Sequence, residues 1–184
     1  MGGNDVGFVD IVEACARTAC ERLVRRDVPG RLTALAADYR ALVAAIAALG
    51  PRRTYITEYA DFLRSSDGGF CGSSTLAGGG RPYPGALSGI SRDESVALHD
   101  VGLAGLRRTM EGIPGWRVIA GVASRTRDHG LCARAPWFNS VEQSFLRQGD
   151  INGTAHPNAR GHRAYAEAIR GALGPLLSPA RSGR

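Results

Sequence analysis

Two short strand-forming segments, each flanked by helical segments, constrain the fold of this chain most strongly. Residues 53–59 are rich in Tyr, Thr and Ile, and residues 116–122 form a short apolar run typical of a buried parallel strand. Alternation of this kind predicts an α/β fold around a parallel sheet. Two strands are too few for a stable sheet of that type, so we expect further strands that precede residue 1.

The first half of the chain has the apolar spacing of two helices. Residues 10–26 have the composition of a helix, and Pro29-Gly30 is expected to end that segment. A clean amphipathic pattern follows over residues 32–49, with apolar side chains at steps of three and four. The sequence therefore predicts two separate helices before the first strand.

The second half contains two further helices and two long loops. The loops cover residues 65–90 and 124–155, and loops of this length in a compact domain are usually functional or disordered. Between them, Ser91 and Glu94 have the spacing of a capping box and predict the start of a helix. The last helix is expected over residues 158–173.

Length and composition favour one globular domain. The chain has 184 residues, of which 43% are hydrophobic, enough for a single core. We assign residues 1–175 to the domain and 176–184 to a polar tail. The net charge of +6 does not indicate nucleic-acid binding, because every basic residue is Arg and these are scattered without a basic stripe or an aromatic ladder. No apolar run is long enough to span a bilayer, and we expect no cofactor.

Four cysteines, Cys15, Cys20, Cys71 and Cys132, favour disulfides and an oxidising compartment because their number is even. One alternative is four buried free thiols in a cytosolic protein. Another is a thiol or metal site that uses Cys132 and His129, although the spacing supports it weakly. Residues five apart in a straight helix lie about 7.5 Å apart along its axis, which is too far for a disulfide. If Cys15 and Cys20 pair, the first predicted helix must break between them.

A histidine near the C-terminus gives the strongest chemical signal. In the segment GDINGTAHPNARGHR, His156 ends a Gly-containing loop, Pro157 fixes the next backbone torsion, and Asn158 is a natural N-cap for the last helix. A histidine at such a junction is well placed to act as a general base and acid. The alternative is an exposed loop histidine, and we expect His99 and His162 to be surface residues.

The opening segment MGGND places Asn4 in a turn flanked by glycine. The side-chain amide of an asparagine in such a turn can point into a cleft and stabilise an oxyanion. Taken alone, the segment is better explained as a turn followed by a helix cap.

Four motifs that occur in order favour a catalytic role for Asn4 over a simple turn. They are GGNDVGF, the cysteines that follow it, DHGLC in the second loop, and HPNARGHRAYA before the last helix. Together they resemble the SGNH hydrolases, also called GDSL esterases and lipases, and most closely their disulfide-bearing bacterial branch. The resemblance covers about residues 2–172. It implies a flavodoxin-like three-layer α/β/α fold, in which a serine activated by a histidine attacks the carbonyl carbon of an ester.

The resemblance also assigns roles to residues of this chain. Asn4 matches the oxyanion asparagine, Gly2 matches the glycine of the same motif, and His156 matches the catalytic base. The motif with the nucleophilic serine and the second oxyanion motif have no counterpart here, so we expect them upstream of residue 1. The family's usual acid is replaced by Gly153, whose backbone carbonyl we expect to orient His156, with Asp150 as the weaker candidate.

We predict the disulfides Cys15–Cys20 and Cys71–Cys132, the second of which would tie the two long loops together. The expected function is that of the C-terminal portion of a serine ester hydrolase, secreted or extracytoplasmic, acting on an ester or lipid substrate and inactive by itself. The alternative is a non-catalytic remnant or binding domain derived from the same fold.

Overall fold

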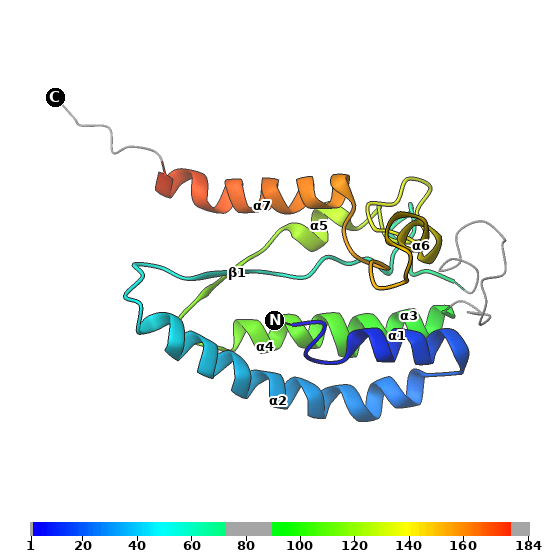
Figure 1. Cartoon of the computed structure of the whole chain (residues 1–184), viewed down its shortest axis with the longest axis horizontal. Coiled ribbons are helices and arrows are strands. Elements are labelled where there is room, and N and C mark those ends of the chain that lie inside the picture. Colours follow the sequence, from blue (N-terminus) through cyan, green and yellow to red (C-terminus); the bar gives the residue numbers. More distant parts are fainter. Residues whose placement is uncertain (1, 73–89, 178–184) are drawn as a thin grey trace.

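The computed structural model describes residues 2–72 and 90–177 (Figure 1). Most of the first predicted loop and most of the predicted tail therefore lie outside the described residues. The elements in chain order are α1 (Phe8–Arg17), α2 (Glu21–Ala47), β1 (Tyr55–Thr57), α3 (Arg92–Ala97), the π-helical turn η1 (Leu98–Leu103), α4 (Ala104–Glu111), β2 (Arg117–Ile119), α5 (Val122–Thr126), α6 (Val141–Gln148) and α7 (Ala159–Leu177).

The sheet of the described residues has two parallel strands. Tyr55 of β1 is in register with Arg117 of β2, and Thr57 is in register with Ile119. Figure 1 shows α5 and α7 on one side of β1, and α1, α2, α3 and α4 on the other. The predicted α/β class and the parallel strand pair are confirmed. The flavodoxin-like three-layer arrangement requires more strands than these two and stays a prediction.

A disulfide closes the corner between the first two helices. Cys15 and Cys20 are bonded with their Cα atoms 4.7 Å apart, and the chain leaves the helical conformation between Arg17 and Glu21. The predicted pairing and the helix break that it requires are both present. The carboxylate of Glu94 accepts a hydrogen bond of 2.7 Å from the N–H of Cys20, which gives a partner to one buried N–H that has none within the helix at the start of α2.

The prediction that Pro29-Gly30 ends a helix is wrong, because α2 runs through both residues. A proline inside a helix removes one hydrogen bond and costs roughly 3 kcal/mol. Both residues lie on the exposed face, while the opposite face is buried from Val24 to Tyr39. Burial of each of these side chains contributes roughly 1.5–3 kcal/mol, so their sum outweighs the proline. The buried residues are Val24, Val28, Leu32, Leu35 and Tyr39.

The helical segment after the first loop begins as predicted. The Ser91 hydroxyl accepts a hydrogen bond from the N–H of Glu94, and the Glu94 carboxylate accepts one from the N–H of Ser91, which completes a capping box. Farther along, α4 packs closely against α2. A Cβ atom at Gly105 would lie 2.5 Å from Cδ1 of Leu32, so a glycine at this position allows the close approach.

The prediction of an unbroken loop over residues 124–155 is also wrong, because α5 extends into it and α6 lies within it. A capping box between Ser140 and Gln143 begins α6, and Gly149 ends it in the left-handed conformation. The Ser-x-x-Gln spacing is readable in the sequence, so this helix had a local signal. The loop between α6 and α7 is consequently limited to residues 149–158.

Candidate functional site

A cavity of about 230 Å³ brings together three of the residues predicted for catalysis: Gly2, Asn4 and His156 all belong to its wall. Gly2 and Asn4 come from the turn before α1, whereas His156 comes from the loop between α6 and α7. Gly153 and Asp150 are not among the lining residues. Two segments that are far apart in the sequence therefore meet at one cavity.

A tight turn holds Asn4 at this cavity. The N–H of Val6 donates to the carbonyl of Gly2 at 3.1 Å, and the N–H of Gly3 donates to the hydroxyl of Tyr59 at 2.6 Å. Gly2 has a φ of +135°, and a Cβ atom there would lie 2.3 Å from the Tyr59 hydroxyl, so the turn requires glycine. The Asn4 side chain is exposed and forms no hydrogen bond with the described residues.

The backbone around His156 is firmly held. The N–H of Asn139 donates to the carbonyl of His156, and the N–H of Ala155 donates to the carbonyl of Asn139, both at 2.9 Å. Ala155 has a φ of +62°, the only positive value of a non-glycine residue in the described part of the chain. Strained backbone of this kind clusters at active sites and ligand clamps. The imidazole of His156 is exposed and has no hydrogen-bond partner among the described residues.

The two candidates for orienting His156 contact other groups. The carbonyl of Gly153 accepts a hydrogen bond of 3.1 Å from the backbone N–H of His156, not from its ring. The Asp150 carboxylate accepts hydrogen bonds from the N–H of Asn152 and the amide of Gln148, and these bonds hold the pKa of Asp150 below its usual value. Orientation of the ring by Gly153 therefore stays a prediction, and Asp150 serves the turn after α6.

The rest of the cavity wall is mostly apolar and was not predicted from the sequence. Phe62 and Phe138 lie with their ring centroids 6.0 Å apart, and Phe8 meets Phe62 edge-on at 5.6 Å. The hydroxyl of Tyr165 accepts a hydrogen bond of 3.1 Å from the N–H of Ala60. These side chains come from separate elements, so no local spacing in the sequence relates them.

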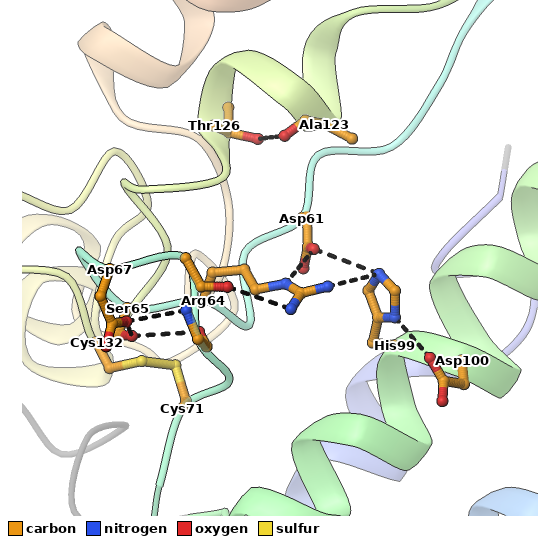
Figure 2. Close-up of polar contacts among 12 residues, drawn as sticks. Asp61, Arg64, Ser65, Asp67, Cys71, His99, Asp100, Ala123, Thr126 and Cys132 are labelled. Atoms are coloured by element: carbon orange, nitrogen blue, oxygen red, sulfur yellow. Dashed lines mark hydrogen bonds and ion pairs between the residues drawn. A yellow bond between two sulfur atoms is a disulfide. The ribbon is translucent and has the colours of Figure 1, made fainter.

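A second polar cluster lies outside this cavity and was also missed (Figure 2). His99 was expected at the surface, but its side chain is only 25% exposed and lies between two carboxylates. Its Nε2 is 3.3 Å from Oδ2 of Asp61, and its Nδ1 is 2.8 Å from Oδ1 of Asp100. Arg64 donates to the same oxygen of Asp61 at 2.6 Å and stacks over the ring of Phe70.

Hydrogen bonds and neighbouring charges shift the pKa values of His99 and Asp61 in this cluster. The hydrogen bond to Asp61 raises the pKa of His99 above its usual value, against the opposing effect of burial. Burial by itself would raise the pKa of Asp61, but hydrogen bonds from His99 and Arg64 outweigh it and lower that pKa. The imidazole of His99 thus lies between two acidic side chains, and the cluster joins the segment after β1 to η1.

The second predicted disulfide, Cys71–Cys132, is present. Cys132 is therefore not available as a thiolate ligand, which removes the alternative of a metal or thiol site with His129. The ring of His129 instead stacks on Trp137 with a centroid separation of 3.9 Å. Neither cysteine of this disulfide lines the cavity. In the described residues, no three His, Cys, Asp or Glu side chains gather as a metal site would need.

None of the helices in the described residues is long and apolar enough to cross a membrane. Comparison with protein-family models, with curated proteins and with solved structures found no match to this chain. The interpretation of the cavity therefore depends on its own geometry and on the motifs of the sequence.

Proposed function

We propose that this chain forms most of a carboxylic ester hydrolase of the SGNH type. His156 is the general base, and the Asn4 amide donates a hydrogen bond to the oxyanion. The observation that carries the proposal is that the imidazole of His156 and the amide of Asn4, neither of which has a hydrogen-bond partner among the described residues, line the same cavity although they are far apart in the sequence. A base and an oxyanion donor beside an apolar cavity are groups that acyl transfer requires.

The proposal assigns the nucleophilic serine to a segment that precedes residue 1. No serine or cysteine is among the described residues that line the cavity. His156 takes the proton of the serine hydroxyl as the serine oxygen attacks the ester carbonyl carbon, and Asn4 donates to the oxygen that becomes negative. The alcohol leaves with the proton from His156, and water then hydrolyses the acyl-enzyme by the same steps.

An unpaired edge of β1 supports the placement of such a segment. The N–H of Arg117 donates to the carbonyl of Thr54, and the N–H of Glu58 donates to the carbonyl of Ile119. Alternate residues of a strand bond to opposite sides, so Tyr55 and Thr57 present their backbone groups to the other edge. Among the described residues, no strand pairs with that edge. A further parallel strand can pair there and end beside the turn that holds Asn4.

The two disulfides support an oxidising compartment, because such bonds persist in secreted and extracytoplasmic proteins. The proposed enzyme is accordingly secreted or extracytoplasmic.

The test compares the 184-residue chain with a version extended by the in-frame upstream sequence of its gene. We expect the chain alone to hydrolyse p-nitrophenyl butyrate at the background rate and the extended protein to be active. In the extended protein, His156→Ala should reduce hydrolysis to background, and Asn4→Ala should lower kcat by about 10²–10³-fold. Asp150→Asn should change kcat less than about twofold.

The matched control is His162→Ala, which removes an exposed histidine of α7 outside the cavity and should leave activity unchanged. Hydrolysis by the 184-residue chain that persists in His156→Ala would contradict this assignment. So would equal losses in the two histidine variants of the extended protein. A stop codon directly upstream would favour the alternative of a non-catalytic binding domain.

A further inference from the structure

An asparagine is followed by a glycine only once in this chain, in the loop that carries His156. The chain has four asparagines: Asn4, Asn139, Asn152 and Asn158. Of these, only Asn152 precedes a glycine. We propose that the pair of Asn152 and Gly153 is a self-modification site, at which the asparagine converts spontaneously to aspartate and isoaspartate at a rate restrained by the hydroxyl of Ser144. This proposal is independent of the proposed hydrolase activity.

The conversion requires only these two residues and water. The backbone nitrogen of Gly153 loses its proton and attacks the side-chain carbonyl carbon of Asn152, the C–N bond of the side-chain amide breaks, and its nitrogen leaves with that proton as ammonia. Water then opens the resulting succinimide ring at either carbonyl carbon, which gives aspartate or, when the main chain passes through the former side chain, isoaspartate. One amide and one water thus become one carboxylic acid and one ammonia. Glycine favours the attack because it has no Cβ to hinder the approach of its nitrogen.

The place of the pair in the fold exposes the side chain that reacts. Asn152 is exposed and lies in the loop between α6 and α7, residues 149–158. The N–H of Thr154 donates to the carbonyl of Ile151 at 3.0 Å, so Asn152 and Gly153 are the central residues of a hydrogen-bonded turn. Water therefore has access to the amide that leaves as ammonia and to the ring that forms.

Ser144 of α6 holds the nitrogen that must attack. The N–H of Gly153 donates to Oγ of Ser144 at 2.9 Å, and the Ser144 hydroxyl donates to the carbonyl of Asp150 at 2.8 Å. Ser144 is only 2% exposed, so these bonds tie the turn to the buried face of α6. The Gly153 nitrogen cannot attack while its proton is donated to Ser144. Breaking a typical hydrogen bond first slows the reaction by about fivefold.

Conversion changes the turn that supports His156. The carbonyl of Gly153 accepts a hydrogen bond of 3.1 Å from the N–H of His156. Isoaspartate lengthens the main chain by a methylene directly before Gly153, and this glycine has little room to shift, because a Cβ there would lie 3.0 Å from Oγ of Ser144. Aspartate adds a carboxylate that is repelled by that of Asp150, which accepts from the N–H of Asn152 at 2.8 Å. Either product therefore weakens the contact that holds the backbone of His156.

The experiment follows the conversion by mass spectrometry in the purified, folded 184-residue chain in mildly alkaline buffer. Tryptic digestion in heavy-oxygen water marks any conversion that occurs after the incubation, and fragmentation of the peptides assigns each conversion to one asparagine. We expect Asn152 to convert before the other asparagines, which serve as internal controls. In the converted chain, hydrogen exchange of the His156 N–H should be faster than in the unconverted chain.

Two serine variants of α6 test the restraint. Ser144→Ala removes the acceptor of the Gly153 N–H and should convert about fivefold faster than the wild type in native buffer, the factor of a typical hydrogen bond. In urea this bond is absent from both chains, so their rates should be equal. The matched control is Ser140→Ala, which removes a hydroxyl that contacts Gln143 and not Gly153, and it should convert at the wild-type rate. If circular dichroism shows that Ser144→Ala is unfolded, the wild type in urea is compared with the wild type in native buffer, with the same expected factor.

The proposal is overturned if the folded wild type shows no conversion of Asn152, if another asparagine converts earlier, or if wild type and Ser144→Ala have equal rates in native buffer. Equal acceleration in Ser140→Ala overturns it as well, since loosening of α6 and not the bond to Ser144 would then set the rate. If Ser144→Ala is unfolded, equal wild-type rates in urea and in native buffer have the same meaning. None of these results depends on whether the extended protein hydrolyses esters, so this proposal and the proposed function fail separately.

Discussion

Removal of the long-range disulfide should destabilise the protein more than removal of the short one. The perturbation is the double variant Cys71→Ala/Cys132→Ala, compared with Cys15→Ala/Cys20→Ala. A disulfide limits the conformations of the unfolded chain, and the effect grows with the length of the loop that it closes. The sequence separations are 61 and 5 residues, so the two variants differ mainly in this length.

The expected magnitudes follow from those separations. The chain-entropy relation gives about 4.3 kcal/mol for the bond that spans 61 residues and about 2.1 kcal/mol for the bond that spans 5. Loss of packing acts in the opposite direction, because Cys15 and Cys20 are 2% and 1% exposed while Cys71 is 6% exposed. A larger cost for the Cys71–Cys132 pair therefore cannot come from burial.

Urea unfolding followed by far-UV circular dichroism measures both variants, after mass spectrometry without reductant has verified the disulfide of each. The free energy of unfolding should fall by about 2 kcal/mol more in the Cys71/Cys132 variant than in the Cys15/Cys20 variant. Equal losses of stability, or a larger loss for the Cys15/Cys20 variant, would contradict this explanation. Such a result would mean that local packing at the corner between α1 and α2 matters more than the entropy of the unfolded chain.

Two glycines and one histidine provide further tests. Gly130→Ala should lower the free energy of unfolding in urea by about 3 kcal/mol, because its Cβ would lie 2.3 Å from the carbonyl oxygen of Arg64. Gly30→Ala should raise it by about 1 kcal/mol, because no atom lies within 4 Å of the added Cβ. An unchanged free energy of unfolding in Gly130→Ala would contradict the close contact with Arg64. Because the hydrogen bond to Asp61 raises the pKa of folded His99, its stabilisation is complete below about pH 6.5 and is lost as the pH rises through the folded pKa. The melting temperature should therefore fall more between about pH 6 and pH 9 in the wild type than in His99→Gln, and equal slopes would contradict that linkage.

Local signals predicted the elements whose stability is local. The capping box of Ser91 and Glu94 was readable because both partners lie within one helical turn. The box of Ser140 and Gln143 has the same spacing, although it lies within the segment that the glycines and prolines predict as a loop. The prediction that a helix ends at Pro29 was wrong because the cost of a proline is local, whereas the compensating burial comes from contacts of α2 with helices about 70 residues away in the sequence.

Sequence patterns were enough to predict the α/β class, the parallel strand pair, the cysteines that pair, and one histidine at a loop-to-helix junction. For the site, the motifs singled out Gly2, Asn4 and His156 by resemblance, and these three line one cavity. Sequence patterns did not reveal the apolar wall behind them or the cluster of Asp61 and His99. These side chains meet through packing of distant segments, and contacts of that kind leave no periodicity or fixed spacing along the chain.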